Sequence, residues 1–182
     1  MITKRDRIML CYLEQYEAAR TTSLLMFYND IRTCQRRLKI LHDTKKIGRY
    51  REDINSEYIY YIKKPKQLRH RVILTDFLRE FSKITDIKSC KNKDVQVGHI
   101  RPDAVIGYVL NGKKDVAFVE IQISNLSLDT QKYEKLYYSG AWKEIFPVFP
   151  QIIAVTDRKI PETELKVIKV NEDLSNLEEG FK

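Results

Sequence analysis

Two apolar segments that flank the polar stretch Asn111-Gly112-Lys113-Lys114 constrain the fold more than any other feature of this 182-residue sequence. Residues 104–110 and 116–123 are rich in Val, Ile and aromatic side chains, which favour β-strands. An Asn-Gly pair between such segments is the strongest short-range signal for a two-residue hairpin. The sequence therefore predicts an antiparallel pair of strands in the second half of the chain.

Helices and further strands are expected around this hairpin. The predicted elements are an amphipathic helix from about 71 to 84, a short strand near 95–97 within a polar and irregular stretch over 85–100, a helix over 127–145, and strands over 151–156 and 165–170. This order predicts an α+β layer whose sheet is covered by helices. The last twelve residues are acidic and poor in apolar side chains, so we expect them to form a loosely held tail.

Positive charge is concentrated in the first two fifths of the chain. Residues 1–71 contain 17 Lys and Arg against 8 Asp and Glu, whereas residues 72–182 contain 16 against 17. Such asymmetry is typical of a module that meets a polyanion, joined to a second module with another task. On charge alone, a basic surface that only confers solubility is an equal alternative. Pro65, in the polar stretch 63–67, cannot continue a strand, so we expect one domain over 1–66 and another over 67–182.

The first domain is predicted to contain three helices followed by a β-hairpin. Thr3 and Asp6 form a capping box for a helix over 4–17, and hydroxyls at 21–23 offer caps for a short helix ending near Phe27. Asp30 is a suitable cap for a third helix over 31–42. Strands over 47–51 and 58–62 complete the layout, which is that of a winged helix-turn-helix domain.

The third helix is predicted to carry the DNA contacts. Ile31, Cys34, Leu38 and Leu41 form an apolar stripe, and Arg36 points away from it. Arginine on an exposed helix can address guanine edges in the major groove, while other cations contact phosphates. The expected partner is double-stranded DNA. Base edges are assigned to Arg32, Thr33 and Arg36, with Arg37 and Lys39 beside them; phosphates are assigned to Lys45, Lys46, Arg49, Arg51, Lys63 and Lys64.

Two observations limit this interpretation. A basic amphipathic helix can also present a solvated face or dock a protein partner. Glu52 and Asp53 at the tip of the hairpin argue against entry of that tip into a minor groove. The domain can bind as a monomer or as a homodimer that reads an inverted repeat, and the sequence leaves both open.

A pair of carboxylates is expected at one end of the predicted hairpin of the second domain. Asp103 stands eight residues before the turn and Glu120 eight residues after it, so the two should lie beside each other. Gln122 shares a face with Glu120 because strand side chains alternate. Such carboxylates can hold Mg²⁺ or Mn²⁺, which prefer oxygen ligands and can activate water towards a phosphodiester. The alternative is structural: Asp103 shapes the start of a strand, and Glu120 pairs with Lys113 or Lys114.

The motif Pro102-Asp103 followed by Glu120-x-Gln122, set among these elements, resembles the PD-(D/E)xK nuclease superfamily. The third motif residue of that superfamily is usually Lys, and here it is Gln122. The resemblance implies a nuclease-like domain in which Asp103 and Glu120 hold the metal ion and Asp103, Glu120 and Gln122 form the catalytic motif. A replacement cation is available from Lys132 or Lys135 on the following helix, and Lys135 is counted among the catalytic residues.

The whole chain more specifically resembles the replication-relaxation family of plasmids, phages and conjugative elements, which joins a winged helix to a nuclease-like domain. The matching stretches are Thr3-Lys4-Arg5-Asp6 with Ile8 and Leu10, Arg36-Arg37-Leu38 with Leu41, His70, Arg101-Pro102-Asp103-Ala104, Val119-Glu120-Ile121-Gln122, and Lys135-Leu136-Tyr137. The resemblance implies a DNA-binding accessory protein acting in replication or mobilisation, with replication or relaxase proteins as possible partners. An active metal-dependent endonuclease and a winged-helix transcriptional regulator are the alternatives.

The remaining features exclude other classes. Cys11, Cys34 and Cys90 are odd in number and far apart, so we expect small core residues and neither disulfides nor a zinc site. No apolar run approaches the roughly 20 residues that span a bilayer, and no apolar leader begins the chain. The expectation is a soluble cytoplasmic protein without a membrane partner.

Overall fold

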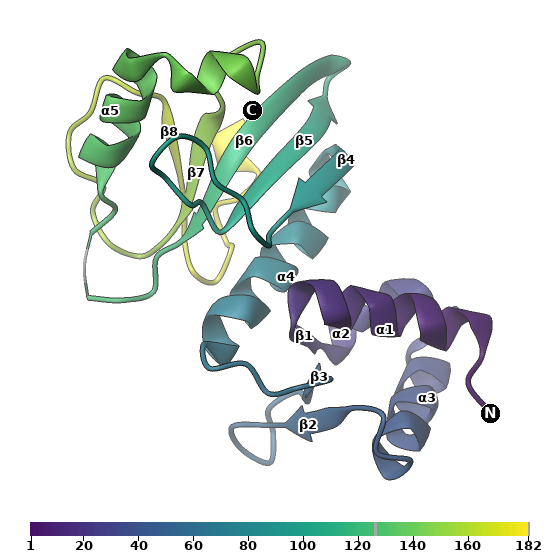
Figure 1. Cartoon of the computed structure of the whole chain (residues 1–182). Helices are drawn as coiled ribbons and strands as arrows, with labels where there is room; N and C mark the ends of the chain where they lie inside the picture. The colour runs from purple at the N-terminus through teal and green to yellow at the C-terminus, as the bar shows by residue number, and fades with distance from the viewer. Residues whose placement is uncertain (126, 182) are drawn as a thin grey trace. The chain divides into compact units, whose positions relative to one another are not determined.

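The computed structural model describes residues 1–125 and 127–181 and combines helices with two β-sheets, so the chain is an α+β protein. It divides into two compact units, Met1–Arg79 and Glu80–Lys182, both visible in Figure 1. The division falls within helix α4 (Leu68–Ile84), which begins directly after the polar stretch around Pro65. No helix in the described ranges has both the length and the apolar character that a membrane span requires.

The first unit contains the predicted helices and hairpin, with a small sheet of order β1-β3-β2 in which both pairings are antiparallel. Its elements before α4 are α1 (Lys4–Tyr16), β1 (Ala19–Arg20), α2 (Thr21–Leu24), η1 (Leu25–Phe27), α3 (Ile31–Asp43), β2 (Gly48–Tyr50) and β3 (Ile59–Tyr61).

Capping explains where the two long helices of this unit begin. The Thr3 hydroxyl accepts from the backbone N–H of Asp6, and the Asp6 carboxylate accepts from that of Thr3, which completes the predicted capping box of α1. Asp30 likewise accepts from the backbone N–H of Thr33 at the start of α3. The predicted hydroxyl cap of α2 is wrong, because its N-cap residue is Arg20, whose side chain makes no capping bond, and the backbone N–H of Thr22 donates instead to the Glu57 carboxylate.

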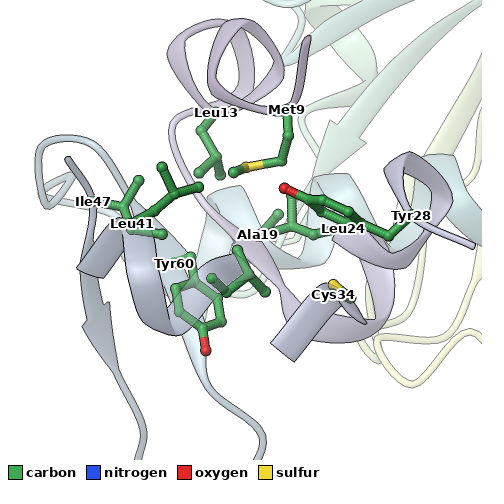
Figure 2. Packing of buried hydrophobic residues seen from close by; sticks show 10 residues of the cluster. Met9, Leu13, Ala19, Leu24, Tyr28, Cys34, Leu41, Ile47 and Tyr60 are labelled. Atoms are coloured by element: carbon green, nitrogen blue, oxygen red, sulfur yellow. The ribbon is translucent and has the colours of Figure 1, made fainter. Parts of the chain in front are cut away.

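The core of the first unit is formed by apolar side chains from α1, α3 and the small sheet, together with Leu24 and Tyr28 on either side of η1, as Figure 2 shows. Met9 and Leu13 of α1 are almost fully buried there, as are Leu38 and Leu41 of α3. Each such side chain stabilises the fold by about 1.5–3 kcal/mol relative to its exposed form. Ile31 was expected in the stripe but is 40% exposed, because α3 begins with it and joins the core only one turn later, at Cys34.

The second unit is built on a five-stranded sheet of order β4-β5-β6-β7-β8. The pairs β4–β5 and β5–β6 are antiparallel, and β6–β7 and β7–β8 are parallel. The elements after α4 are β4 (Asp86–Lys91), β5 (Ala104–Leu110), β6 (Lys113–Ile121), α5 (Thr130–Ser139), η2 (Ala141–Glu144), β7 (Gln151–Val155), β8 (Val167–Val170) and η3 (Glu179–Phe181).

The predicted hairpin is confirmed as the pair β5–β6. Asn111 and Gly112 both have positive φ, 50° and 77°, the backbone that a two-residue turn of this type requires and that Asn-Gly adopts readily. Ala104 pairs with Val119, and Leu110 pairs with Lys113. This register continues to place Asp103 opposite Glu120 at the open end of the hairpin.

Three predictions for the elements beside the hairpin are wrong. The strand expected near 95–97 is only an isolated bridge between Val97 and Ile100. Residues 86–91 form strand β4 rather than an irregular segment; because β4 lies at the edge of the sheet, most of its side chains are exposed and its sequence is polar. The expected helix over 127–145 is shorter. It begins after the N-cap Asp129 and ends at Gly140, whose φ of 71° takes the chain out of the helix.

The C-terminal residues up to Phe181 are packed, which contradicts the expected loose tail. Leu177 is 4% exposed, and the Phe181 ring lies 4.9 Å from the Phe81 ring. The Asn176 side chain bonds to the backbone of Asn171 and Lys169. Leu177, Phe181 and the Asn176 side chain therefore hold this segment in place. The acidic composition of the segment gave no indication of these contacts in the sequence.

Candidate nucleic-acid interface and carboxylate site

The exposed face of α3 is cationic. Its orientation follows from Cys34, Leu38 and Leu41, which face the core and so turn the opposite side of the helix outward. Arg32, Arg36 and Lys39 are exposed on that helix, as predicted. The Thr33 hydroxyl donates to Asp30 Oδ2 at 2.8 Å, so this predicted base-contacting residue takes part in the cap of the helix.

Arg37 does not belong to this exposed face, and the prediction that it presents its charge there is wrong. Its side chain is 17% exposed and forms an ion pair with Asp6, which is fully buried. A second bond joins Arg37 to the backbone carbonyl of Met1 at 3.0 Å. A buried carboxylate needs such a partner, because an unpaired charge in the interior is costly.

The acidity of Asp6 reflects this pairing. Burial alone raises the pKa of the Asp6 carboxyl, but hydrogen bonds from Arg37, from Thr3 and from the Tyr28 hydroxyl outweigh it and lower the pKa to about 2. The Tyr28 hydroxyl lies 2.9 Å from Asp6 Oδ1, and burial and the neighbouring carboxylate raise its pKa. Asp6 is therefore ionised at neutral pH and fixes α3 to α1.

The β2–β3 hairpin presents two arginines on one aromatic ring. The guanidinium carbons of Arg49 and Arg51 lie 4.5 and 4.9 Å from the centre of the Tyr58 ring. Lys64 lies in the same way 4.5 Å from the ring of Tyr50. Cation–π contact restricts these long side chains without neutralising their charge. Lys45 and Lys46, in the turn after α3, are exposed, as is Lys63.

The acidic tip of the hairpin uses its carboxylate internally. Asp53 accepts from the backbone N–H groups of Asn55 and Ser56, at 2.7 and 2.8 Å, and from the Ser56 hydroxyl. These bonds lower the pKa of Asp53, so it stays ionised near neutral pH. The negative charge thus remains at the tip.

The two carboxylates of the second unit lie on the same face of the sheet. Directly opposed residues of an antiparallel pair project to the same side, and the register places Asp103 opposite Glu120. Asp103 Oδ2 accepts from the backbone N–H of Ile121 at 2.8 Å. Asp103 also acts electrostatically on Glu120 and raises its pKa. The predicted proximity of the two groups is confirmed.

Glu120 is buried beneath α5 and is paired with it. Its residue is 7% exposed, Lys132 Nζ lies 2.7 Å from Oε1, and the Tyr133 hydroxyl donates a short bond to the same oxygen. Burial raises the pKa of Glu120, and Lys132 and Tyr133 oppose that effect only in part. The alternative pairing of Glu120 with Lys113 or Lys114 is wrong, because the cation comes from α5.

Gln122 and Lys135 are the other two residues predicted for this site. Gln122 follows the end of β6, its backbone N–H donates to Val155 at 2.9 Å, and its side-chain amide donates to the Ser124 hydroxyl. Lys135 is exposed on α5, one turn beyond Lys132. Lys132 is thus the cation that reaches Glu120.

The carboxylate pair fits one mode of magnesium binding. Mg²⁺ is commonly held by one or two carboxylates, with water and substrate phosphate oxygens as its other ligands. Asp103 and Glu120 supply this number of carboxylates, but Asp103 Oδ2 accepts from the backbone N–H of Ile121, and Glu120 Oε1 accepts from Lys132 and Tyr133. Within residues 1–125 and 127–181 there is no group of three or more His, Cys, Asp and Glu side chains that could form a fuller protein site.

Comparison with known proteins adds no relative: no family model, no curated protein and no solved structure matches this chain.

Sequence reasoning missed three of the partners described above. Tyr133 follows Lys132 directly, but a tyrosine on an amphipathic helix reads as core. Tyr58 stands across the hairpin from Arg49 and Arg51, and this aromatic among cations was the available signal. The Asp6–Arg37 pair spans 31 positions in sequence and left no local pattern.

Proposed function

We propose that the protein binds double-stranded DNA through its first unit, as a winged helix-turn-helix domain, and acts as an accessory factor in the replication or mobilisation of a mobile genetic element. The observation that carries the proposal is the exposed cationic face of α3, with Arg32, Arg36 and Lys39 turned away from the core. The resemblance of the sequence to the replication-relaxation family supports the biological setting.

In this proposal α3 enters the major groove. Arg36 is opposite the buried stripe, so it is the residue best placed to address the N7 and O6 acceptors of guanine. Arg49 and Arg51 contact phosphates from the hairpin. Their contact with the Tyr58 ring already restricts both side chains, so they lose less conformational entropy on binding. Lys45 and Lys46 extend the phosphate contacts.

DNA binding is tested by fluorescence anisotropy with the full chain and duplexes of different sequence. Selection from a pool of random duplexes supplies the preferred site, and the symmetry of that site distinguishes binding as a monomer from binding as a homodimer. Arg36→Ala is expected to weaken binding to the preferred site by about 1–3 kcal/mol and to relax sequence preference. Equal losses on all sequences contradict the assignment of Arg36 to base edges.

The second unit supports a second candidate function, a metal-dependent endonuclease of the PD-(D/E)xK kind. The observation that favours it is the shared face of Asp103 and Glu120 with Lys132 beside them. Mg²⁺ or Mn²⁺, when bound, supplies charge for a phosphodiester oxygen and lowers the pKa of a water molecule. Asp103 and Glu120 would hold the ion, and Lys132 would supply the cation that Gln122 lacks.

An assay with supercoiled, linear and branched DNA separates the two functions of the second unit. The full chain is incubated with Mg²⁺ or Mn²⁺ beside Asp103→Ala and Glu120→Ala variants. Cleavage that disappears in both variants establishes the nuclease. Binding without cleavage under every condition supports the accessory role alone.

A further inference from the structure

A concave surface lies on the sheet of the second unit, beyond the paired carboxylates. It is a groove of about 470 Å³ whose floor includes Val105 and Val116 and whose side is formed by Ile145 and Phe146. Gly107 also contributes to the floor, where a Cβ atom would lie only 2.7 Å from the Ser89 hydroxyl. A larger residue at this position would therefore require the Ser89 hydroxyl to move.

The groove continues the face that carries the carboxylates. Asp103 directly precedes β5, and Val105 is the second residue of that strand. If the strand alternation continues to Asp103, the two side chains project to the same side, about 7 Å apart along the chain. Gln96 lines the groove as well and accepts from Arg101 at 3.2 Å. The groove and the carboxylate pair therefore share one face of the sheet.

The chemistry of the groove combines an apolar interior with a cationic margin. Lys91 and Lys93 are exposed at its edge, and Asp94 is the one acidic residue among its lining residues. The Phe146 ring is held edge-on to Phe118, with centroids 5.8 Å apart, so its orientation is fixed. An aromatic ring, aliphatic side chains and nearby lysines are the elements that bind the bases and phosphates of single-stranded nucleic acid.

An extended peptide is the main competing occupant, and strand β4 argues against it. A peptide would add to the sheet along β4, the edge strand. The register of β4 shifts between Ile87 and Ser89, and Lys88 and Lys91 lie along the strand. Irregularities and lysines at a sheet edge disfavour the addition of another strand.

We propose that this groove binds an unpaired nucleotide of DNA, with its base against Phe146 and the valines and its phosphate near Lys91 and Lys93. The inference rests on the proposed function, since it names the form of DNA that the second unit engages. A base within a duplex is stacked on its neighbours and must leave the stack to enter a pocket. The second unit therefore selects single strands, gaps or branch points, whereas α3 binds duplex.

The test measures the affinity of the full chain for fluorescein-labelled oligothymidylate of 12 nucleotides, beside a 20-base-pair duplex. Phe146→Leu keeps an apolar side chain of similar volume but removes the ring. Phe149→Leu is the matched control, because Phe149 also packs against Phe118, with centroids 6.0 Å apart, and does not line the groove. Phe146→Leu is expected to weaken oligothymidylate binding at least fivefold, while Phe149→Leu leaves it within twofold.

A second pair of variants tests the phosphate contacts. The double variant Lys91→Ala, Lys93→Ala is expected to weaken oligothymidylate binding and to reduce its salt dependence, whereas Lys143→Ala, which lies outside the groove, is not. No oligothymidylate binding by the native chain, or equal binding by Phe146→Leu and Phe149→Leu, overturns the proposal. So does a groove that binds an acidic peptide of alternating Glu and Val while oligothymidylate does not compete.

The duplex measurements keep this outcome separate from that of the proposed function. Arg36→Ala is expected to weaken duplex binding and to leave oligothymidylate binding unchanged, and Phe146→Leu the reverse. If the native chain does not bind duplex, only the function proposed for the first unit is contradicted. If the native chain does not bind oligothymidylate, only the proposal for the groove is contradicted.

Discussion

The ammonium group of Lys132 lies 2.7 Å from Oε1 of Glu120, which is buried against α5. This contact fixes the first turn of α5 over the end of β6 and places a cation beside the two carboxylates of the second unit. In the second candidate function, this cation would supply the charge that Gln122 lacks.

Loss of this cation is expected to destabilise the second unit. Lys132→Met keeps much of the side-chain volume but leaves Glu120 with Tyr133 as its remaining partner, so the free energy of unfolding should fall by about 1–3 kcal/mol. Lys135→Met is the control on the exposed side of α5 and should change it by less than about 0.5 kcal/mol. Urea denaturation at pH 7 measures both. Equal effects of the two substitutions contradict a structural role for the Lys132–Glu120 pair.

The raised pKa of Glu120 predicts a pH-dependent contribution to stability. Burial favours the protonated carboxyl in the folded chain, so the folded state binds more protons than the unfolded one above pH 4.5, the ordinary pKa of Glu. Stability contributed by this group is therefore present at low pH and is lost as the pH rises through the raised pKa. Glu120→Gln does not ionise, so its stability relative to the native chain should increase from pH 4.5 towards 8. A difference between the two proteins that stays constant with pH refutes this assignment.

Arg37 and Arg36 are neighbours with opposite roles, which gives a matched pair. Arg37→Ala leaves the buried Asp6 without its cation and should lower the free energy of unfolding by about 3–5 kcal/mol. Arg36→Ala should leave stability within about 0.5 kcal/mol and reduce DNA affinity instead. Chemical denaturation and anisotropy, applied to both variants, give four values to compare. A stable Arg37→Ala protein with weakened DNA binding would return Arg37 to the DNA-contacting face.

The lowered pKa of Asp6 predicts where the first unit loses stability in acid. The pKa falls from 3.8 to about 2 on folding, so the carboxylate contributes about 2 kcal/mol at neutral pH. This contribution is present above pH 3.8 and is lost as the pH falls towards 2. Asp6→Asn lacks it at every pH, so the difference from the native chain should disappear between pH 4 and 2. The unfolding free energies of both proteins across this range provide the measurement.

Local signals were sufficient for much of the fold. The capping box of Thr3 and Asp6 placed α1, Asp30 placed α3, and the Asn-Gly turn fixed the register of β5 and β6, because each signal acts over a few residues. The same turn placed Asp103 opposite Glu120. At these positions the backbone geometry of a helix cap or a tight turn favours the residue types that the sequence has there.

Long-range contacts explain the errors. Strand β4 is polar because it lies at an edge, and its place in the sheet comes from pairing with β5. The inward orientation of Arg37 follows from Asp6, which is distant in sequence. The sequence offered four lysines as the cation beside Glu120, namely Lys113, Lys114, Lys132 and Lys135. Only the packing of α5 on the sheet selects Lys132.

The salt dependence of duplex binding tests the central claim most directly. The full chain is titrated with its preferred duplex between 50 and 200 mM salt, beside the double variant Lys45→Ala, Lys46→Ala. The native chain should lose affinity steeply as salt increases, and the variant should bind more weakly on every sequence with a slope smaller by roughly two units. No binding of any duplex by the native chain at 50 mM salt, or a slope unchanged in the variant, contradicts the account.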